Sequence, residues 1–129
     1  MKPITREWID KDEGDWSTLM REFRARKNLN YDAVCFHAQQ CTEKYLKARL
    51  QEASISFKKT HDLKILLNDI LPIEPTWVNL QNSADSLTIY AVKFRYPGNS
   101  SNKSEAKEAV KYCSLIRNAV RQSFNLPIK

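Results

Sequence analysis

The side chains best suited to chemistry in this chain gather on one helical stretch, residues 31–48. At about 100° per residue, His37, Gln40, Lys44 and Lys47 share one face of that helix. An imidazole titrates near neutral pH and can transfer protons, and lysine ammonium groups attract anions. This polar face is therefore the first candidate for a functional site, although hydrogen bonding across a helical bundle would also explain His37.

Two residues further along the chain extend this set. Arg95 comes at the expected end of a helix, just before Pro97-Gly98, where a guanidinium can hold a phosphate or carboxylate through two hydrogen bonds. Capping that helix and bracing the following loop is the alternative role. His61 opens a short helix, where a structural hydrogen bond is an alternative to ligand contact.

Composition limits the class of protein. With 129 residues the chain fits one domain, residues 1–129, that needs no disulfide or metal to hold its core. The net charge of +6 favours polyanions as partners, although the cationic run at residues 21–27 also suits the end of a helix. No apolar run is long enough to cross a bilayer, so we expect a cytoplasmic protein without membrane contact.

The cysteine pattern argues against a metal centre. Cys35, Cys41 and Cys113 are an odd number with no C-x-x-C spacing, and reduced, buried, structural thiols are the favoured interpretation. Neither histidine is paired with a carboxylate or a cysteine at ligand spacing on one helix. No metal or other cofactor is expected.

Periodicity and capping signals place the elements that must position these residues. Apolar residues at spacings of three and four, with no convincing alternation, predict an all-α chain. The predicted helices cover residues 5–27, 31–53 with Asn30 as N-cap, 60–71 with Thr60 as N-cap, 76–94, and 103–124 with Asn102 and Glu105 as a capping box. We expect an antiparallel up-and-down four-helix bundle with one additional short helix.

Four short motifs occur in a fixed order along nearly the whole chain. They are an early Trp with a later acidic residue, at Trp8 and Asp15; F-H-x-x-Q-x-x-E-K, at Phe36, His37, Gln40, Glu43 and Lys44; His-Asp-Leu, at His61 to Leu63; and Arg-Tyr-Pro, at Arg95 to Pro97. In this order the motifs resemble those of the HEPN domain family, whose members are small helical domains.

Many HEPN proteins are metal-independent ribonucleases, and the resemblance alone would imply such an activity. Their catalytic motif is Arg-x(4–6)-His, in which the Arg stabilises phosphate charge while the His transfers protons. This chain lacks the motif, since neither His37 nor His61 follows an Arg by five to seven residues. No catalytic residue is assigned from the sequence.

HEPN proteins without that motif commonly accompany a minimal nucleotidyltransferase. The resemblance therefore implies a non-catalytic module that binds a nucleotide or polyanion and supports such a partner, as one half of a toxin–antitoxin pair. The expected site is a polar groove at a dimer seam, with His61 and Arg95 approaching His37, Gln40, Lys44 and Lys47. Two alternatives stay open: a ribonuclease toxin with a displaced site, in which His37 acts with Arg95 or Arg117, and a purely structural interaction bundle.

A homodimer is expected on physical grounds as well. Phe36 lies about 160° from Val34 around the helix, away from the main apolar stripe, so a monomer would leave it substantially exposed. Burying such a side chain contributes roughly 1.5 to 3 kcal/mol. Phe36 and Trp16 are the interface candidates, with Phe36 covered by a second subunit or by the first helix.

Overall fold

The computed structural model describes residues 1–128, and these residues form helices and connecting loops without any strand. In chain order the elements are α1 (Pro3–Arg24), α2 (Tyr31–Glu52), α3 (Leu63–Ile70), the 3-10 segment η1 (Pro75–Leu80), α4 (Gln81–Thr88), the 3-10 segment η2 (Ile89–Ala91) and α5 (Lys103–Ser123). The all-helical class predicted from the sequence is confirmed. Across residues 1–128, every helix is too short or too polar to span a membrane.

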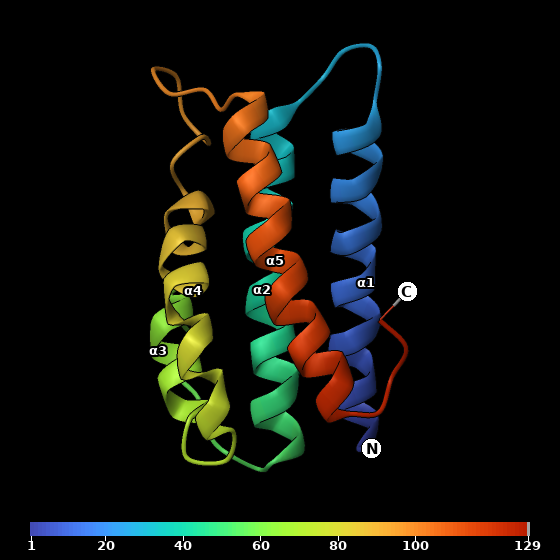
Figure 1. Ribbon diagram of the computed structural model, residues 1–129, viewed down its shortest axis with the longest axis vertical. Coiled ribbons are helices and arrows are strands. Elements are labelled where there is room, and N and C mark those ends of the chain that lie inside the picture. Colours follow the sequence, from blue (N-terminus) through green and yellow to red (C-terminus); the bar gives the residue numbers. More distant parts are fainter. Residues whose placement is uncertain (129) are drawn as a thin grey trace.

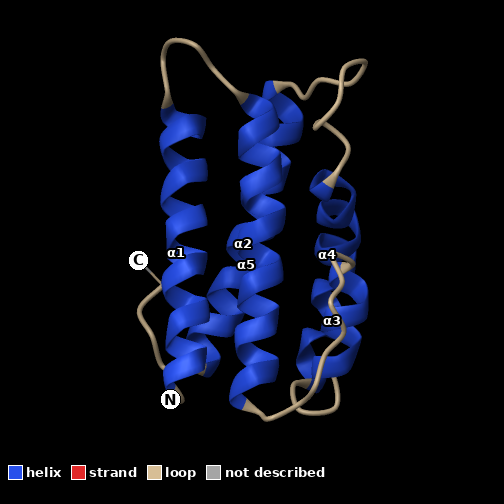
Figure 2. Ribbon diagram, turned by 180° about the vertical axis from the view of Figure 1, so that it is seen from behind, coloured by secondary structure: helices blue, strands red, loops and turns tan. Residues whose placement is uncertain are grey.

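Helix α2 is the centre of the fold. In both views α1 lies on one side of α2 and α5, and α3 with α4 lies on the other side (Figures 1 and 2). Helix α2 contacts α1, α3, α4, η2 and α5. Twelve of its 22 residues are buried, and four of those twelve are polar, so its burial extends well beyond one apolar stripe. The buried polar residues are Gln39, Thr42, Glu43 and Lys47.

The caps of two long helices agree with the sequence prediction. Asn30 Oδ1 accepts a hydrogen bond from the Ala33 backbone N–H at 3.0 Å, and Asn102 Oδ1 accepts one from the Glu105 N–H at 2.8 Å. Each bond satisfies one of the free N–H groups of a first turn. The capping box at Asn102 is only half formed, because the Glu105 carboxylate pairs with Lys93 instead, at 3.4 Å.

The bounds of α1 and α3 differ from those predicted. Helix α1 ends at Arg24 and not at Lys27, and the chain then turns through Asn28, which adopts a left-handed φ of 53°. Helix α3 is capped by Asp62, whose carboxylate accepts from the N–H groups two and three residues on, whereas Thr60 accepts from the Asp62 N–H. The prediction of Thr60 as the cap was therefore wrong by two residues.

Residues 76–94, predicted as one helix, are interrupted. An eight-residue α-helix, α4, lies between the 3-10 segments η1 and η2. A 3-10 helix repeats every three residues, so a spacing of three, such as Trp77 to Leu80 within η1, does not distinguish it from an α-helix. The apolar stripe itself is buried as predicted over the residues Trp77, Leu80, Ala84, Leu87 and Ala91. The three cysteines are also buried and unbridged.

Candidate functional site

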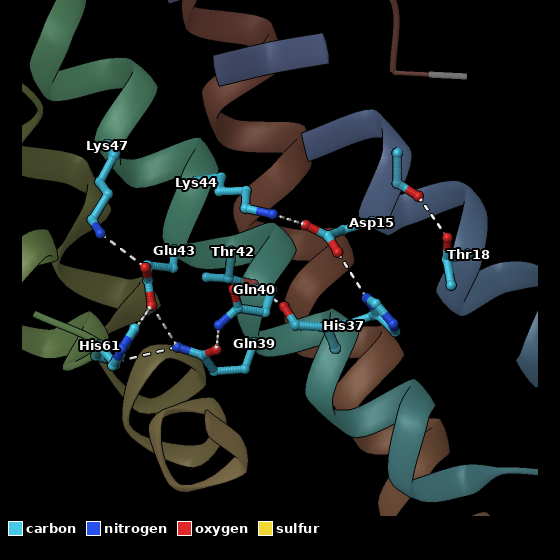
Figure 3. Close-up of polar contacts among 12 residues, drawn as sticks. Asp15, Thr18, His37, Gln39, Gln40, Thr42, Glu43, Lys44, Lys47 and His61 are labelled. Carbon is cyan, nitrogen blue, oxygen red and sulfur yellow. Dashed lines mark hydrogen bonds and ion pairs between the residues drawn. The ribbon is translucent and has the colours of Figure 1, made fainter. Parts of the chain in front are cut away.

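The first polar cluster joins α1 to α2 through one carboxylate. Asp15 Oδ1 lies 2.7 Å from His37 Nδ1, and Lys44 Nζ donates to Asp15 Oδ2 at 2.5 Å (Figure 3). Burial alone would raise the pKa of Asp15, but the hydrogen bonds from His37 and Lys44 outweigh it and lower that pKa. Asp15 is thus an ionised anchor that orients His37.

The second cluster is built around Glu43, which is buried. Its carboxylate accepts from Lys47 Nζ at 2.8 Å and from Gln39 Nε2 at 3.0 Å, and it lies 2.8 Å from His61 Nδ1 (Figure 3). Burial tends to raise the pKa of Glu43, yet these partners lower it. The ion pair of Glu43 and Lys47 is buried, because α3 and the preceding loop cover this part of α2.

The six residues predicted as a site fall into three places. His37 and Arg95 line one groove. Lys44 bonds to Asp15 and is not part of the groove lining. Gln40 donates to Gln39 Oε1 at 2.7 Å and so adjoins the Glu43 cluster. The remaining two, Lys47 and His61, belong to the Glu43 cluster, with His61 still largely exposed to solvent.

The groove lies between α2 and the segment that follows α4. It has a volume of about 360 Å³, and its walls carry three aromatic rings. Tyr90 and Phe94 are stacked with their ring centroids 5.6 Å apart, and Phe36 forms part of the α2 wall. The lining residues are Asn30, Asp32, Ala33, Phe36, His37, Tyr90, Phe94 and Arg95.

A polar latch fixes the loop that carries Arg95. Ser101 donates its backbone N–H to Asp32 Oδ1 at 2.6 Å, and its hydroxyl lies 3.2 Å from Cys35 Sγ. Both partners belong to the first two turns of α2. The latch therefore ties the far end of the loop to the helix that forms the opposite wall of the groove.

Arg117 is absent from this groove. Its guanidinium makes a two-bond contact with Glu13, at 3.0 and 2.8 Å, and donates to the Ile128 carbonyl at 2.9 Å. It also stacks on Trp16, with its central carbon 4.6 Å from the ring centroid. Arg117 is 3% exposed and fully engaged within α1, α5 and the tail, so of the two arginines considered with His37 only Arg95 shares its groove.

Several residues of the two clusters and the groove were not predicted as site residues from the sequence. Asp15 reaches His37 across 22 positions, and no local pattern predicts that contact. Asp32 and Asn30 line the groove, but in sequence they read only as the first turn and cap of a helix. For the part of the chain described, His, Cys, Asp and Glu side chains form no group of three or more able to hold a metal ion.

Comparison with known proteins gives one match. A family model described as HEPN domain matches residues 5–123, which is nearly the whole chain. No curated protein and no solved structure matches the chain. The match spans α1 to α5 and includes every residue of the groove and of both polar clusters.

Proposed function

The chain belongs to the HEPN domain family, and we propose that it is a non-catalytic member that binds a nucleotide or another phosphate-bearing polyanion in the groove between α2 and residues 90–95. The observation that carries the proposal is that His37 and Arg95, 58 positions apart in sequence, line the same groove. An exposed guanidinium and an imidazole in the same groove suit a phosphate group.

The remaining walls suit the rest of a nucleotide. Phe36 and Phe94 offer aromatic rings on which a base can stack, an interaction that every base can make. The groove volume of about 360 Å³ is at the small end of the range for ligand sites, which fits one nucleotide unit. The net charge of +6 attracts such a ligand from a distance.

The absence of the Arg-x(4–6)-His motif from the sequence supports a binding role over a catalytic one. We place the chain beside a minimal nucleotidyltransferase, as one half of a toxin–antitoxin pair, and as a homodimer with the groove near the dimer seam. The half-buried Phe36 at the groove supports that seam, because it is absent from the side chains packed on the core. Co-purification with a nucleotidyltransferase encoded next to it would test the partnership.

Calorimetric titration with ATP and GTP at low salt tests the binding itself. We expect heat of binding from the unmodified protein and an affinity at least about tenfold weaker for Arg95→Met, because a charge-assisted phosphate contact is lost. Arg6→Met is the matched control, since Arg6 is exposed on α1 outside the groove lining. No heat at millimolar nucleotide would refute direct binding.

One observation favours a second candidate, a metal-independent ribonuclease with a displaced site. If Asp15 accepts from His37 Nδ1–H, the neutral imidazole keeps its lone pair on Nε2, as a general base requires. Arg95 would then stabilise the phosphate charge. Cleavage of RNA by metal-free protein, abolished in His37→Ala and retained in His61→Ala, would favour this candidate over the non-catalytic one.

A further inference from the structure

The polar groups of the groove are unevenly distributed around α2. At about 100° per residue, Asp32, Phe36, Ala33 and His37 follow one another around the helix at about 0°, 40°, 100° and 140°. Asp32 is bonded toward the loop before α5, and His37 is bonded toward α1. The carboxylate and the imidazole therefore stand on opposite flanks of the groove, with Phe36 between them.

The flank at Asp32 presents one hydrogen-bond acceptor and one donor. Asp32 uses Oδ1 for the Ser101 N–H, and Asn30 uses Oδ1 for the Ala33 N–H. Within residues 1–128 no hydrogen bond engages Asp32 Oδ2 or the Asn30 side-chain amide nitrogen. An acceptor oxygen and a donor nitrogen are therefore free at the same edge of the groove.

We propose that this groove selects a guanine nucleotide bearing a single phosphate group, an inference that rests on the nucleotide-binding function proposed above. The guanine base stacks on Phe36 and turns its N1–H and 2-amino group to Asp32 and its O6 to Asn30. Adenine presents a ring acceptor at N1, which the carboxylate repels. A carboxylate at the edge of the groove therefore distinguishes guanine from adenine through the pattern of hydrogen-bond donors and acceptors on each base.

The charge of the lining sets the number of phosphates. It contains one guanidinium, Arg95, one imidazole, His37, and one carboxylate, Asp32. The nearby Lys93 and Lys44 are paired with Glu105 and Asp15. One phosphate can lie between Arg95 and His37, whereas the further phosphates of a triphosphate find no additional free cation among the lining residues.

Titration calorimetry with GMP, IMP and AMP tests the base selection without altering the protein. We expect GMP to bind at least about tenfold more tightly than AMP, with IMP, which lacks the 2-amino group, in between. We expect GTP to bind no more than about threefold more tightly than GMP, because no further cation faces it. Equal affinities for GMP and AMP would overturn the base selection, and much tighter GTP binding would overturn the single-phosphate assignment.

The matched variant is Asp32→Asn, which keeps an oxygen for the Ser101 N–H and replaces the free oxygen by a donor. We expect GMP affinity to fall at least about tenfold and AMP affinity to stay the same or rise. Asp85→Asn on α4, outside the groove lining, should leave both unchanged. Unchanged GMP binding by a folded Asp32→Asn protein would remove Asp32 from recognition and overturn the proposal.

Two further comparisons distinguish failure of the proposed function from failure of the guanine selection, and a free nucleotide from RNA as the ligand. If no nucleotide binds, the proposed function itself fails; if all purine nucleotides bind alike and Arg95→Met weakens them, only the guanine selection fails. A free mononucleotide and a guanine within a single strand share the recognised groups. A trinucleotide U-G-U that binds more tightly than GMP, while U-A-U does not, would identify RNA as the source; GMP binding alone would identify the free nucleotide.

Discussion

Asp15 on α1 and His37 on α2 meet across the helix pair with Oδ1 and Nδ1 2.7 Å apart, and Lys44, two turns further along α2, bonds to the same carboxylate. Because both partners come from rigid helices, the imidazole is fixed in direction before any ligand arrives. The same carboxylate also joins α1 to α2. It therefore affects both the stability of the helix pair and the groove.

The first prediction concerns acid. Since the folded-state pKa of Asp15 lies below its ordinary value of 3.8, its ion pairs stabilise the fold above about pH 4, and this contribution is lost as pH falls through the folded pKa. Asp15→Asn should lower the melting temperature at pH 7, and the difference from the unmodified protein should shrink as the pH falls below about 4. Thermal unfolding followed by circular dichroism from pH 2 to 7 measures this. Asp85→Asn, at an exposed ion pair, should show a much smaller effect at either pH.

The second prediction has the opposite sign. Asp12 is fully buried, and within the described residues neither of its carboxylate oxygens has a hydrogen-bond partner. Burial, only partly offset by Lys44, raises its pKa well above the ordinary 3.8. The folded state therefore binds this proton more tightly than the unfolded chain, and stability is lost as pH rises above about 4.

Asp12→Asn should remove that loss, because an amide does not ionise. We expect its free energy of unfolding to match that of the unmodified protein near pH 4 and to exceed it by on the order of 1 to 2 kcal/mol at pH 8. Urea unfolding at the two pH values provides the comparison. An Asn variant that is less stable at pH 8 would mean that Asp12 has a stabilising partner there.

The third prediction concerns the contact between Glu13 and Arg117. Arg117 is 3% exposed, so deleting Glu13 leaves a buried guanidinium with only the Ile128 carbonyl and the Trp16 ring as partners. Glu13→Ala should destabilise the protein by about 2 to 3 kcal/mol. A double-mutant cycle with Arg117→Met should show coupling, the double variant being more stable than the sum of the single losses predicts. Strict additivity would show that the two side chains act independently.

The fourth prediction concerns self-association. Trp16, one interface candidate, already stacks on Arg117, whereas Phe36 is only half-buried at the groove. We expect sedimentation equilibrium at tens of micromolar protein to give about twice the 15.1 kDa mass of the chain, and Phe36→Asp to reduce it toward one mass. Val78→Asp, at an exposed apolar residue outside the groove, should leave the mass unchanged. A monomer mass for the unmodified protein would contradict the dimer.

Local signals explain which parts of the fold could be predicted. Asn30 and Asn102 were identified as caps because a cap depends on residues only three positions away. The interruption of residues 76–94 could not be predicted, since α and 3-10 turns both place Trp77, Leu80 and Leu87 on one side. The end of α1 depends on a left-handed residue, Asn28, whose identity permits that conformation without requiring it.

The candidate site was harder to predict because its contacts are long-range. The polar face of α2 indicated which side chains were available. Contacts with other elements then divide these side chains between two clusters and a groove. Lys44 and His37 share Asp15 of α1, and Lys47 meets Glu43 beneath α3. Glu43 is buried by the elements that pack over it, and the periodicity of α2 alone does not show that burial. Arg95 and His37 line the same groove because of the turn after α4, and helical periodicity does not predict the course of that turn.

The position of α2 at the centre has a consequence for how this sequence can diverge. Four of its residues bond to other elements: Asp32 to the loop before α5, His37 to α1, Glu43 to the loop before α3, and Tyr45 to both α1 and α5. A substitution at any of these positions removes a hydrogen bond to another element, so a change at the partner position can compensate for it. We expect the sequence of α2 to change more slowly than that of the other helices among related chains. Substitutions at these four positions should be accompanied by substitutions at their partner positions.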